Sequence, residues 1–245
     1  MKNISNLIIS FLLIIIMSCS SGEEKSTNEN ETGTETEVLS EEWIVLFDGT
    51  STEGWRGYNS DKLPEAWIIE DGTLKSLGKG GDIGGDIVYG EKEFEYFELY
   101  LEWKISEGGN SGIFYHVKEG EQYHAPYENA PEYQLIDDIK FPGNLEEWQK
   151  VGADYAMYPA PEDKPIKPAG EWNTTRIVYK KEKAEYYLNG VKVVEFVPWS
   201  EDWMERRNSG KWDKYPDYGK YKTGLIGLQD HGSFIWFRNI KIKEL

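Results

Sequence analysis

Residues 224–239, GLIGLQDHGSFIWFRN, hold the side chains of this sequence that are best suited to chemistry. An apolar, strand-like run is interrupted by Gln229, Asp230 and His231 before it resumes at Phe234. An imidazole beside a carboxylate can be held in one tautomer and can carry a proton near neutral pH. We therefore interpret His231, at the end of a strand where a loop can admit a ligand, as a candidate proton carrier. A purely structural histidine is the simpler alternative.

Residues 131–138, PEYQLIDD, form a second polar segment at a place where core residues are expected. In an extended strand, alternate side chains point to opposite faces. Glu132 and Gln134 would then lie side by side on one face, and Asp137 would point to the other. A solvated sheet face explains the same pattern without any chemistry.

A third polar segment, GGNSG at residues 108–112, precedes the apolar run IFYH. Glycine and asparagine accept unusual backbone dihedrals, so a tight turn accounts for the segment. The alternative is that Asn110 helps to bind a ligand.

The elements that must position these segments are β-strands. Residues 97–105 alternate apolar and mostly polar side chains, as a strand with one buried face does. Residues 185–197 predict a hairpin with Asn189 and Gly190 in a type I′ turn. Residues 175–179 and 235–242 are further strands. Apart from a short turn at 145–150, no long stretch has helical periodicity, so we predict an all-β sandwich of two antiparallel sheets.

Two long segments, 119–131 and 198–223, interrupt the regular spacing of turns. Loops of this length in a compact domain are usually functional or poorly ordered. The second is rich in tryptophan and tyrosine, and exposing so many rings to water is costly, so we favour a packed, functional loop. Within it, Lys211, Trp212 and Tyr215 are candidate ligand contacts, although loop packing explains the two rings equally well.

The first 42 residues differ in composition from the rest. Residues 1–19 resemble a lipoprotein signal, with an apolar run too short to span a bilayer and with Cys19, the only cysteine, as the lipidated residue. An ordinary cleaved signal is the alternative. Residues 20–42 carry eight Glu and one Lys and almost no apolar side chains, as in a flexible acidic linker. Residues 43–245 then form the folded domain, which we expect to be anchored in a Gram-negative cell envelope, at the outer membrane.

The charge of the chain argues against one class of partner. The formal net charge is −17, and the domain has no stripe of lysine and arginine. Such a surface repels a phosphate backbone, so we expect no nucleic-acid partner. With a single cysteine, an intramolecular disulfide is impossible, and the fold must depend on burial of apolar surface.

Several of these segments carry a resemblance to a known family. They are WIVLFDGT (43–50), WIIEDGTL (67–74), GGNSGIFY (108–115), PEYQLIDD (131–138), PAGEWNTTRIVY (168–179), YLNGVKVVEF (187–196) and GLQDHGSFIWFRNIKIK (227–243). Together they resemble the 3-keto-disaccharide hydrolase family from about Trp43 to Leu245. The resemblance implies a concanavalin-like jelly roll that acts on 3-keto-glucosides or 3-keto-disaccharides. It also implies a sugar 3-dehydrogenase as the upstream pathway partner.

The chemistry that the resemblance implies depends on the ketone at C3. Removal of the C2 proton gives a carbanion stabilised by the C3 oxygen, and the C1 aglycone leaves by β-elimination; hydration completes a net hydrolysis. We assign His231 as the C2 base, oriented by Asp230 or Asp137, and Glu132 as the acid, although the two could exchange roles.

The remaining assignments concern substrate binding. Gln134 and Gln229 would bind the sugar or polarise its C3 oxygen. Tyr155 lies in a segment that resembles a family motif, and it is a further candidate contact together with Lys211. Arg238 is expected to support the sheet.

Cofactors and competing functions complete the sequence-based expectations. No cofactor is predicted, although His231, Glu132 and Asp137 could form an oxygen-rich site for a divalent metal. A non-catalytic carbohydrate-binding lipoprotein is one competing function. Another is a conventional glycoside hydrolase, which needs two carboxyl groups at about 5–5.5 or 6.5–9.5 Å.

Overall fold

The computed structural model describes residues 42–80 and 85–245. All of these residues fall within one unit, Val38–Leu245. The predicted signal, Cys19 and nearly all of the acidic linker lie outside the described residues. Within residues 42–80 and 85–245, no helix has the length and apolar character needed to cross a bilayer.

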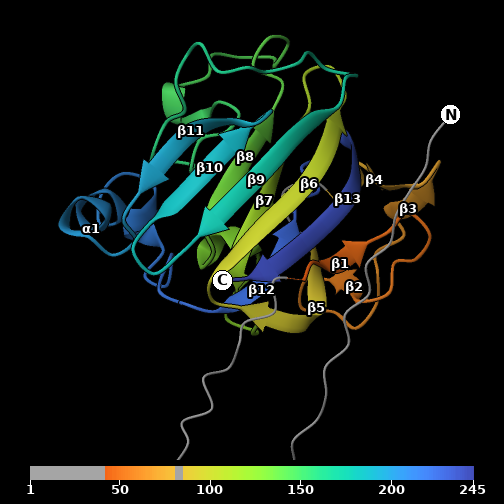
Figure 1. Cartoon of the computed structure of the whole chain (residues 1–245), viewed down its shortest axis with the longest axis horizontal. Coiled ribbons are helices and arrows are strands. Elements are labelled where there is room, and N and C mark those ends of the chain that lie inside the picture. The colour runs from red at the N-terminus through yellow and green to blue at the C-terminus, as the bar shows by residue number, and fades with distance from the viewer. Residues whose placement is uncertain (1–41, 81–84) are drawn as a thin grey trace, which may run out of the picture. The chain divides into compact units, whose positions relative to one another are not determined.

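Two antiparallel sheets pack face to face, as predicted (Figure 1). The eight-stranded sheet has the order β11 (Val191–Phe196), β10 (Ala184–Leu188), β9 (Asn173–Tyr179), β6 (Phe97–Ile105), β13 (Phe234–Glu244), β4 (Thr73–Leu77), β3 (Trp67–Glu70), with β1 (Ile44–Phe47) also paired to β13. The five-stranded sheet has the order β2 (Trp55–Gly57), β5 (Ile87–Phe94), β12 (Gly224–Leu228), β7 (Asn110–Val117), β8 (Glu132–Ile136). The all-β sandwich prediction is confirmed.

The strand patterns read from the sequence match the observed strands closely. Along β6, buried and half-buried residues alternate without a break, so that Trp103 and its apolar neighbours face the core. The β10–β11 hairpin turns at Asn189 and Gly190, whose φ angles are 48° and 83°. Positive φ at both central residues is the property that defines a type I′ turn.

The segment after β11 is packed, as expected, but it contains a helix that the sequence did not predict. Helix α1, Glu201–Arg207, has only seven residues, too few to produce a clear helical period. The Ser200 hydroxyl accepts a hydrogen bond from the Trp203 backbone amide at its N-terminus. Further along, the rings of Trp212 and Tyr218 stack at 3.7 Å, and both are fully buried.

Three short 3₁₀ helices lie among the described residues. The first is η1, Pro126–Glu128, in the first long segment, and the second is η2, Glu147–Gln149, where the sequence predicted a short turn. A third, η3 (Trp212–Lys214), follows α1.

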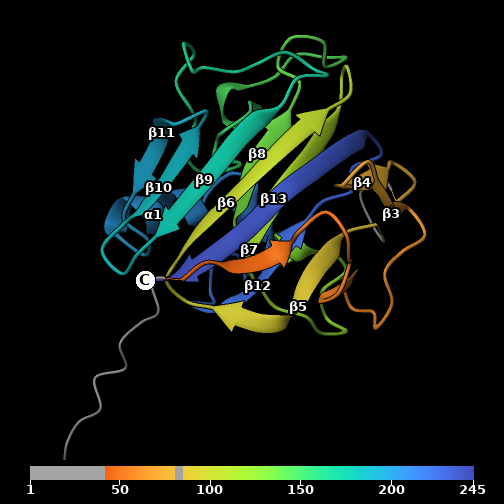
Figure 2. The ribbon, with the colours of Figure 1, turned by 45° about the vertical axis from the view of Figure 1, so that its right-hand side comes forward.

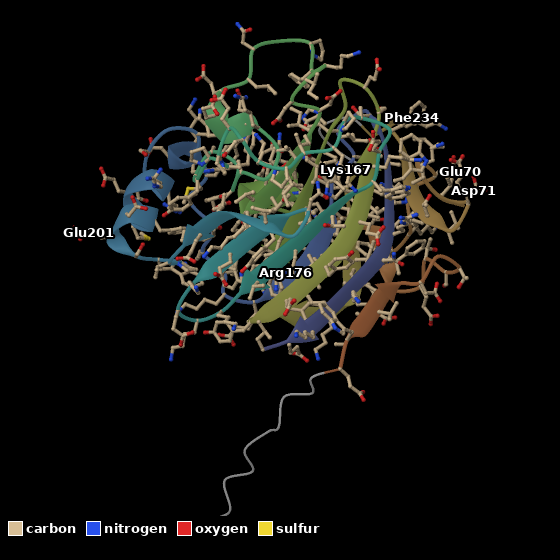
Figure 3. The ribbon with its side chains drawn as sticks, turned by 45° about the horizontal axis from the view of Figure 1, so that its top comes forward. Glu70, Asp71, Lys167, Arg176, Glu201 and Phe234 are labelled. Carbon is tan, nitrogen blue, oxygen red and sulfur yellow. The ribbon has the colours of Figure 1, made fainter. Side chains whose placement is uncertain are left out.

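The outer face of the eight-stranded sheet is polar and charged. Figure 3 looks onto this face and labels Arg176, whose guanidinium lies 3.8 Å from the Tyr187 ring centre. Arg238 has the structural role predicted for it, because it binds the Glu102 carboxylate at 2.7 Å and stacks on Trp172. On this face, Arg176 and Arg238 thus bind neighbouring side chains of the protein itself.

Candidate active site

A cavity of about 180 Å³ lies on the outer face of the five-stranded sheet, the face turned away from the core. Its lining consists of side chains from β7, from β8, from the loop after β12 and from the long segments that cover the sheet. They are Asn110, Tyr127, Glu132, Gln134, Tyr155, Lys211, Tyr215, Gln229 and His231. All but Tyr127 are residues that the sequence singled out.

Strand pairing brings the three polar segments together. β7 lies between β12 and β8, with Gly112 opposite Gln134 and Phe114 opposite Glu132. The Gln229 backbone amide donates to the Gly112 carbonyl at 3.0 Å, which holds the loop after β12 against β7. His231 and Glu132 therefore approach the cavity from opposite sides of β7.

Glu132 and Gln134 share the outer face of β8, as the alternation predicted. Both line the cavity, whereas Tyr133 and Leu135 lie in the core between the sheets. Since the edge of β8 pairs with residues 152–155, including a bond from the Tyr155 amide to the Glu132 carbonyl at 3.0 Å, the strand is fixed on both sides.

The Glu132 side chain is almost completely buried, with 4% of its surface exposed. Burial raises the pKa of its carboxyl group from 4.5 to about 8, and the positive charge of Lys211 opposes part of this rise. Glu132 is therefore mostly protonated at pH 7. A buried carboxylic acid that keeps its proton can donate it to a departing oxygen.

Gly112 provides the space that the Glu132 carboxyl occupies. A Cβ atom at residue 112 would lie 2.1 Å from the Glu132 Oε1 atom and 2.8 Å from its Cγ. No real contact is that short, so only glycine at this position of β7 permits the observed placement of the acid.

His231 lies at the end of β12, where it is half-buried and lines the cavity. That Asp230 orients His231 stays a prediction, because the partners found for the Asp230 carboxylate are backbone amides. It accepts hydrogen bonds from the Gly80 amide at 2.8 Å and the Gly232 amide at 3.1 Å, and the residue is fully buried. Asp230 fixes the loop that carries His231 and does not line the cavity.

Asp137 makes structural contacts, and its catalytic role stays a prediction that these contacts do not support. Its carboxylate accepts hydrogen bonds from the backbone amides of Gly108, Ile139 and Lys140 at 2.9 to 3.3 Å. The side chain is on the face opposite to Glu132 and is absent from the lining of the cavity. It stabilises the turn after β8.

Two side-chain amide oxygens of the cavity can accept further hydrogen bonds. The Gln134 Nε2 atom donates to the Asn110 Oδ1 atom and to the Gln149 carbonyl, both at 3.2 Å. The Oε1 atoms of Gln134 and Gln229 are buried, and neither has a partner among the described residues. A buried acceptor without a donor costs about 1–3 kcal/mol, so these oxygens favour a ligand that brings hydroxyl groups.

Aromatic rings and one cation form the wall opposite the sheet. The Lys211 ammonium lies 4.3 Å from the Tyr155 ring centre and 5.1 Å from that of Tyr127, whose ring packs edge-on against Tyr215. Tyr127 was missed by the sequence analysis, although its place in the long segment 119–131 was a usable signal. Trp212 was predicted to contact substrate, but it is fully buried, it stacks on Tyr218 and it does not line the cavity.

Asp154 is a second buried carboxyl that the sequence analysis missed. It lies at the edge of β8, where it bridges to Tyr133, and it is fully buried. Burial raises its pKa well above the usual range, and this outweighs the opposing effect of the Tyr186 hydroxyl. Burial therefore favours the neutral form of the Asp154 carboxyl group.

The residues present do not fit the divalent metal site considered from the sequence. Asp137 accepts hydrogen bonds from backbone amides and does not line the cavity with Glu132 and His231. Across residues 42–80 and 85–245, no group of three or more histidine, cysteine, aspartate or glutamate side chains is placed to hold a metal ion.

Comparison with known proteins gives the family. The family model described as the 3-keto-alpha-glucoside-1,2-lyase-like domain matches residues 42–243. A curated protein of Bacteroides thetaiotaomicron named 3-keto-disaccharide hydrolase is 39% identical over an alignment 235 residues long, which covers 83% of this chain and 78% of the relative. The chain belongs to the 3-keto-disaccharide hydrolase family. It is therefore an enzyme of that family, as the resemblance predicted.

Two solved structures from Parabacteroides distasonis, both of candidate glycosyl hydrolases, are similar to this 3-keto-disaccharide hydrolase family member. One is 44% identical with a TM-score of 0.77 and covers 83% of this chain and 94% of its own. The other is 33% identical with a TM-score of 0.65 and covers 83% and 100%.

Proposed function

We propose that this cavity cleaves 3-keto-glucosides, and 3-keto-disaccharides in particular, by elimination across C1 and C2 followed by hydration. The name of the Bacteroides relative supports this substrate class. The single observation that carries the mechanism is that Glu132, a buried carboxyl with a raised pKa, and His231 line one cavity from opposite sides of β7.

The first step is removal of the C2 proton by the His231 imidazole. The electron pair of the C2–H bond moves towards C3 and places negative charge on the C3 oxygen. A positioned base contributes about 10²–10⁴-fold to such a step. Donors at the developing oxyanion, such as the side-chain amides of Asn110 and Gln229, contribute roughly 2.7–4 kcal/mol each.

The second step breaks the bond between C1 and the glycosidic oxygen. The C3 carbonyl re-forms, a double bond forms between C1 and C2, and Glu132 gives its proton to the departing oxygen. Water then adds across the double bond, with its hydroxyl at C1 and a proton at C2. The sequence left the roles of Glu132 and His231 interchangeable; the raised pKa of Glu132 favours Glu132 as the acid.

Conventional glycoside hydrolysis is disfavoured by the composition of the cavity. It requires a second carboxyl group about 5–5.5 or 6.5–9.5 Å from the first. Among the described residues that line the cavity, Glu132 is the only carboxylic acid.

A substrate panel tests the proposal. The purified domain is incubated with 3-keto-trehalose, 3-keto-sucrose and the unoxidised sugars, with and without chelator. We expect turnover of the keto sugars only, loss of at least about 100-fold in kcat/KM for His231→Ala, and retained binding by that variant. Turnover of unoxidised sugars would refute the mechanism, and wild-type binding without any turnover would support the carbohydrate-binding alternative.

We further propose the cellular setting expected from the sequence. The chain would be lipidated on Cys19 and held at the outer membrane of a Gram-negative cell, downstream of a sugar 3-dehydrogenase that supplies the C3 ketone. Mass spectrometry of the N-terminal peptide from cells tests this. An unmodified Cys19, or cleavage elsewhere, would overturn the lipid anchor.

A further inference from the structure

The cavity is small compared with a disaccharide. At about 180 Å³ it offers room for the ring that reacts, and the second ring must lie beyond it. Two neighbouring hollows each share one lining residue with the cavity. The Trp148 hollow, of about 440 Å³, is bordered by Trp148, Met157, Arg206, Ser209 and Lys211, and Lys211 is shared.

The Tyr123 hollow is the other neighbour. It has about 380 Å³ and is bordered by Tyr123, Glu128, Lys214 and Asp217, with Tyr215 shared. The Tyr123 hydroxyl already makes two hydrogen bonds within the protein, to the Asp217 carboxylate at 2.6 Å and to the Tyr221 hydroxyl at 2.7 Å. The Trp148 hollow meets the cavity at Lys211, and the Tyr123 hollow meets it at Tyr215.

The position of the acid distinguishes them. Within the five-stranded sheet the order β12, β7, β8 places His231 on one side and Glu132 on the other, at the edge strand. The chain that pairs with this edge runs from Gly152 to Tyr155 and continues directly into the Trp148 hollow at Met157. A group attached to the oxygen that Glu132 protonates therefore starts on the β8 side of the cavity, from which this chain leads to the Trp148 hollow.

We propose that the Trp148 hollow binds the leaving group, a second pyranose ring of a 3-keto-disaccharide. The inference rests on the proposed function, whose acid sets the direction of the leaving group.

The chemistry of the Trp148 hollow suits a sugar ring. Trp148 is half-buried, and its indole is held edge-on against Tyr155 at 5.3 Å, so that it offers a rigid apolar surface. The Arg206 guanidinium is fixed by the Asp202 carboxylate at 3.1 Å and the Met157 carbonyl at 3.0 Å. A guanidinium has five donor hydrogens, so it can also serve sugar hydroxyl groups.

The test compares two substrates that share the reacting ring. One is a 3-keto-disaccharide, 3-keto-trehalose, and the other is methyl 3-keto-α-glucoside, whose leaving group is too small to reach the Trp148 hollow. The measured quantity is the ratio of their kcat/KM values. We expect Trp148→Ala to lower the ratio about tenfold, since loss of one well-packed aromatic contact costs about 1.4 kcal/mol.

A second variant and a matched control make the result decisive. Ser209→Trp fills the hollow from its exposed rim and should lower the same ratio, whether or not Trp148→Ala folds well. Lys214→Ala, in the Tyr123 hollow, should leave the ratio unchanged. An unchanged ratio in Trp148→Ala and Ser209→Trp overturns the inference, as does a fall in Lys214→Ala alone. If wild-type protein cleaves neither substrate, the proposed function itself fails.

Discussion

Replacement of Gly112 by alanine tests whether the placement of the Glu132 carboxyl controls the rate. The added Cβ would lie 2.1 Å from the Glu132 Oε1 atom, and ordinary contact begins at 3.4 Å, so the oxygen must retreat by about 1.3 Å. The Cγ atom is only 2.8 Å away, so a rotation of the carboxyl alone is insufficient. A misplacement of about 1 Å can cost roughly 10²-fold in rate, and we expect Gly112→Ala to lower kcat/KM by this factor.

Two further variants separate this effect from general damage. Gly227→Ala in the adjacent β12 is the matched control, because its nearest contact would be 3.3 Å and the neighbouring side chain needs to shift only slightly. In a Glu132→Gln background, Gly112→Ala should add little, because the group that it displaces can no longer give a proton. Wild-type kcat/KM in Gly112→Ala, or an equal loss on top of Glu132→Gln, would refute the reasoning.

Three further predictions concern charge and stability. Lys211→Met removes the positive charge that lowers the pKa of Glu132, so the alkaline limb of the pH profile of kcat/KM, near pH 8 in the wild type, should move to higher pH; a shift to lower pH would contradict the assignment. Because the folded-state pKa of Glu132 is raised from 4.5 to about 8, the stability it contributes is complete below pH 4.5 and is lost as pH rises through 8. Thermal unfolding should therefore show that the free energy of unfolding of Glu132→Gln rises relative to that of the wild type between pH 5 and 9, by at most about 4–5 kcal/mol. A difference in free energy of unfolding that does not change with pH would refute this. Asp137→Ala should lower the free energy of unfolding by about 1–3 kcal/mol through loss of bonds to three backbone amides, while the folded protein keeps its kcat/KM; loss of activity without loss of stability would restore Asp137 to the site.

The strands were predictable because their signals are local. The alternation along β6 and the Asn189–Gly190 turn are each set by a few consecutive residues, and both occur where the sequence indicates. Much of the cavity was predictable for a related reason. Glu132, Gln134 and His231 are polar at positions where a strand or strand end would otherwise be apolar, and function is the usual cause of such exceptions.

The roles of the aspartates were not predictable, because they depend on partners far away in the sequence. Asp230 accepts a hydrogen bond from Gly80, 150 residues earlier. Asp137 binds amides of both a preceding loop and its own turn. The local sequence does not distinguish a carboxylate that holds a loop from one that faces a ligand. Only the folded structure shows which partners each carboxylate has.

The pKa of Glu132 also depends on residues that are far away in the sequence. It results from burial beneath the long segments and from the charge of Lys211, which lies about eighty residues away in the chain. No local pattern around PEYQLIDD carries that information. The sequence therefore left the acid and the base interchangeable, and the environment of the folded carboxyl favours one assignment.

The pairing of β1 with β13 has a consequence for how the domain can be attached to other structures. Ile44 lies opposite Ile242, so the first and last strands of the domain run side by side in the eight-stranded sheet (Figure 2). The cavity is on the outer face of the other sheet. A carrier or surface joined at either end of the domain would therefore hold it from one side, and substrate could still diffuse to the reacting groups from the opposite side.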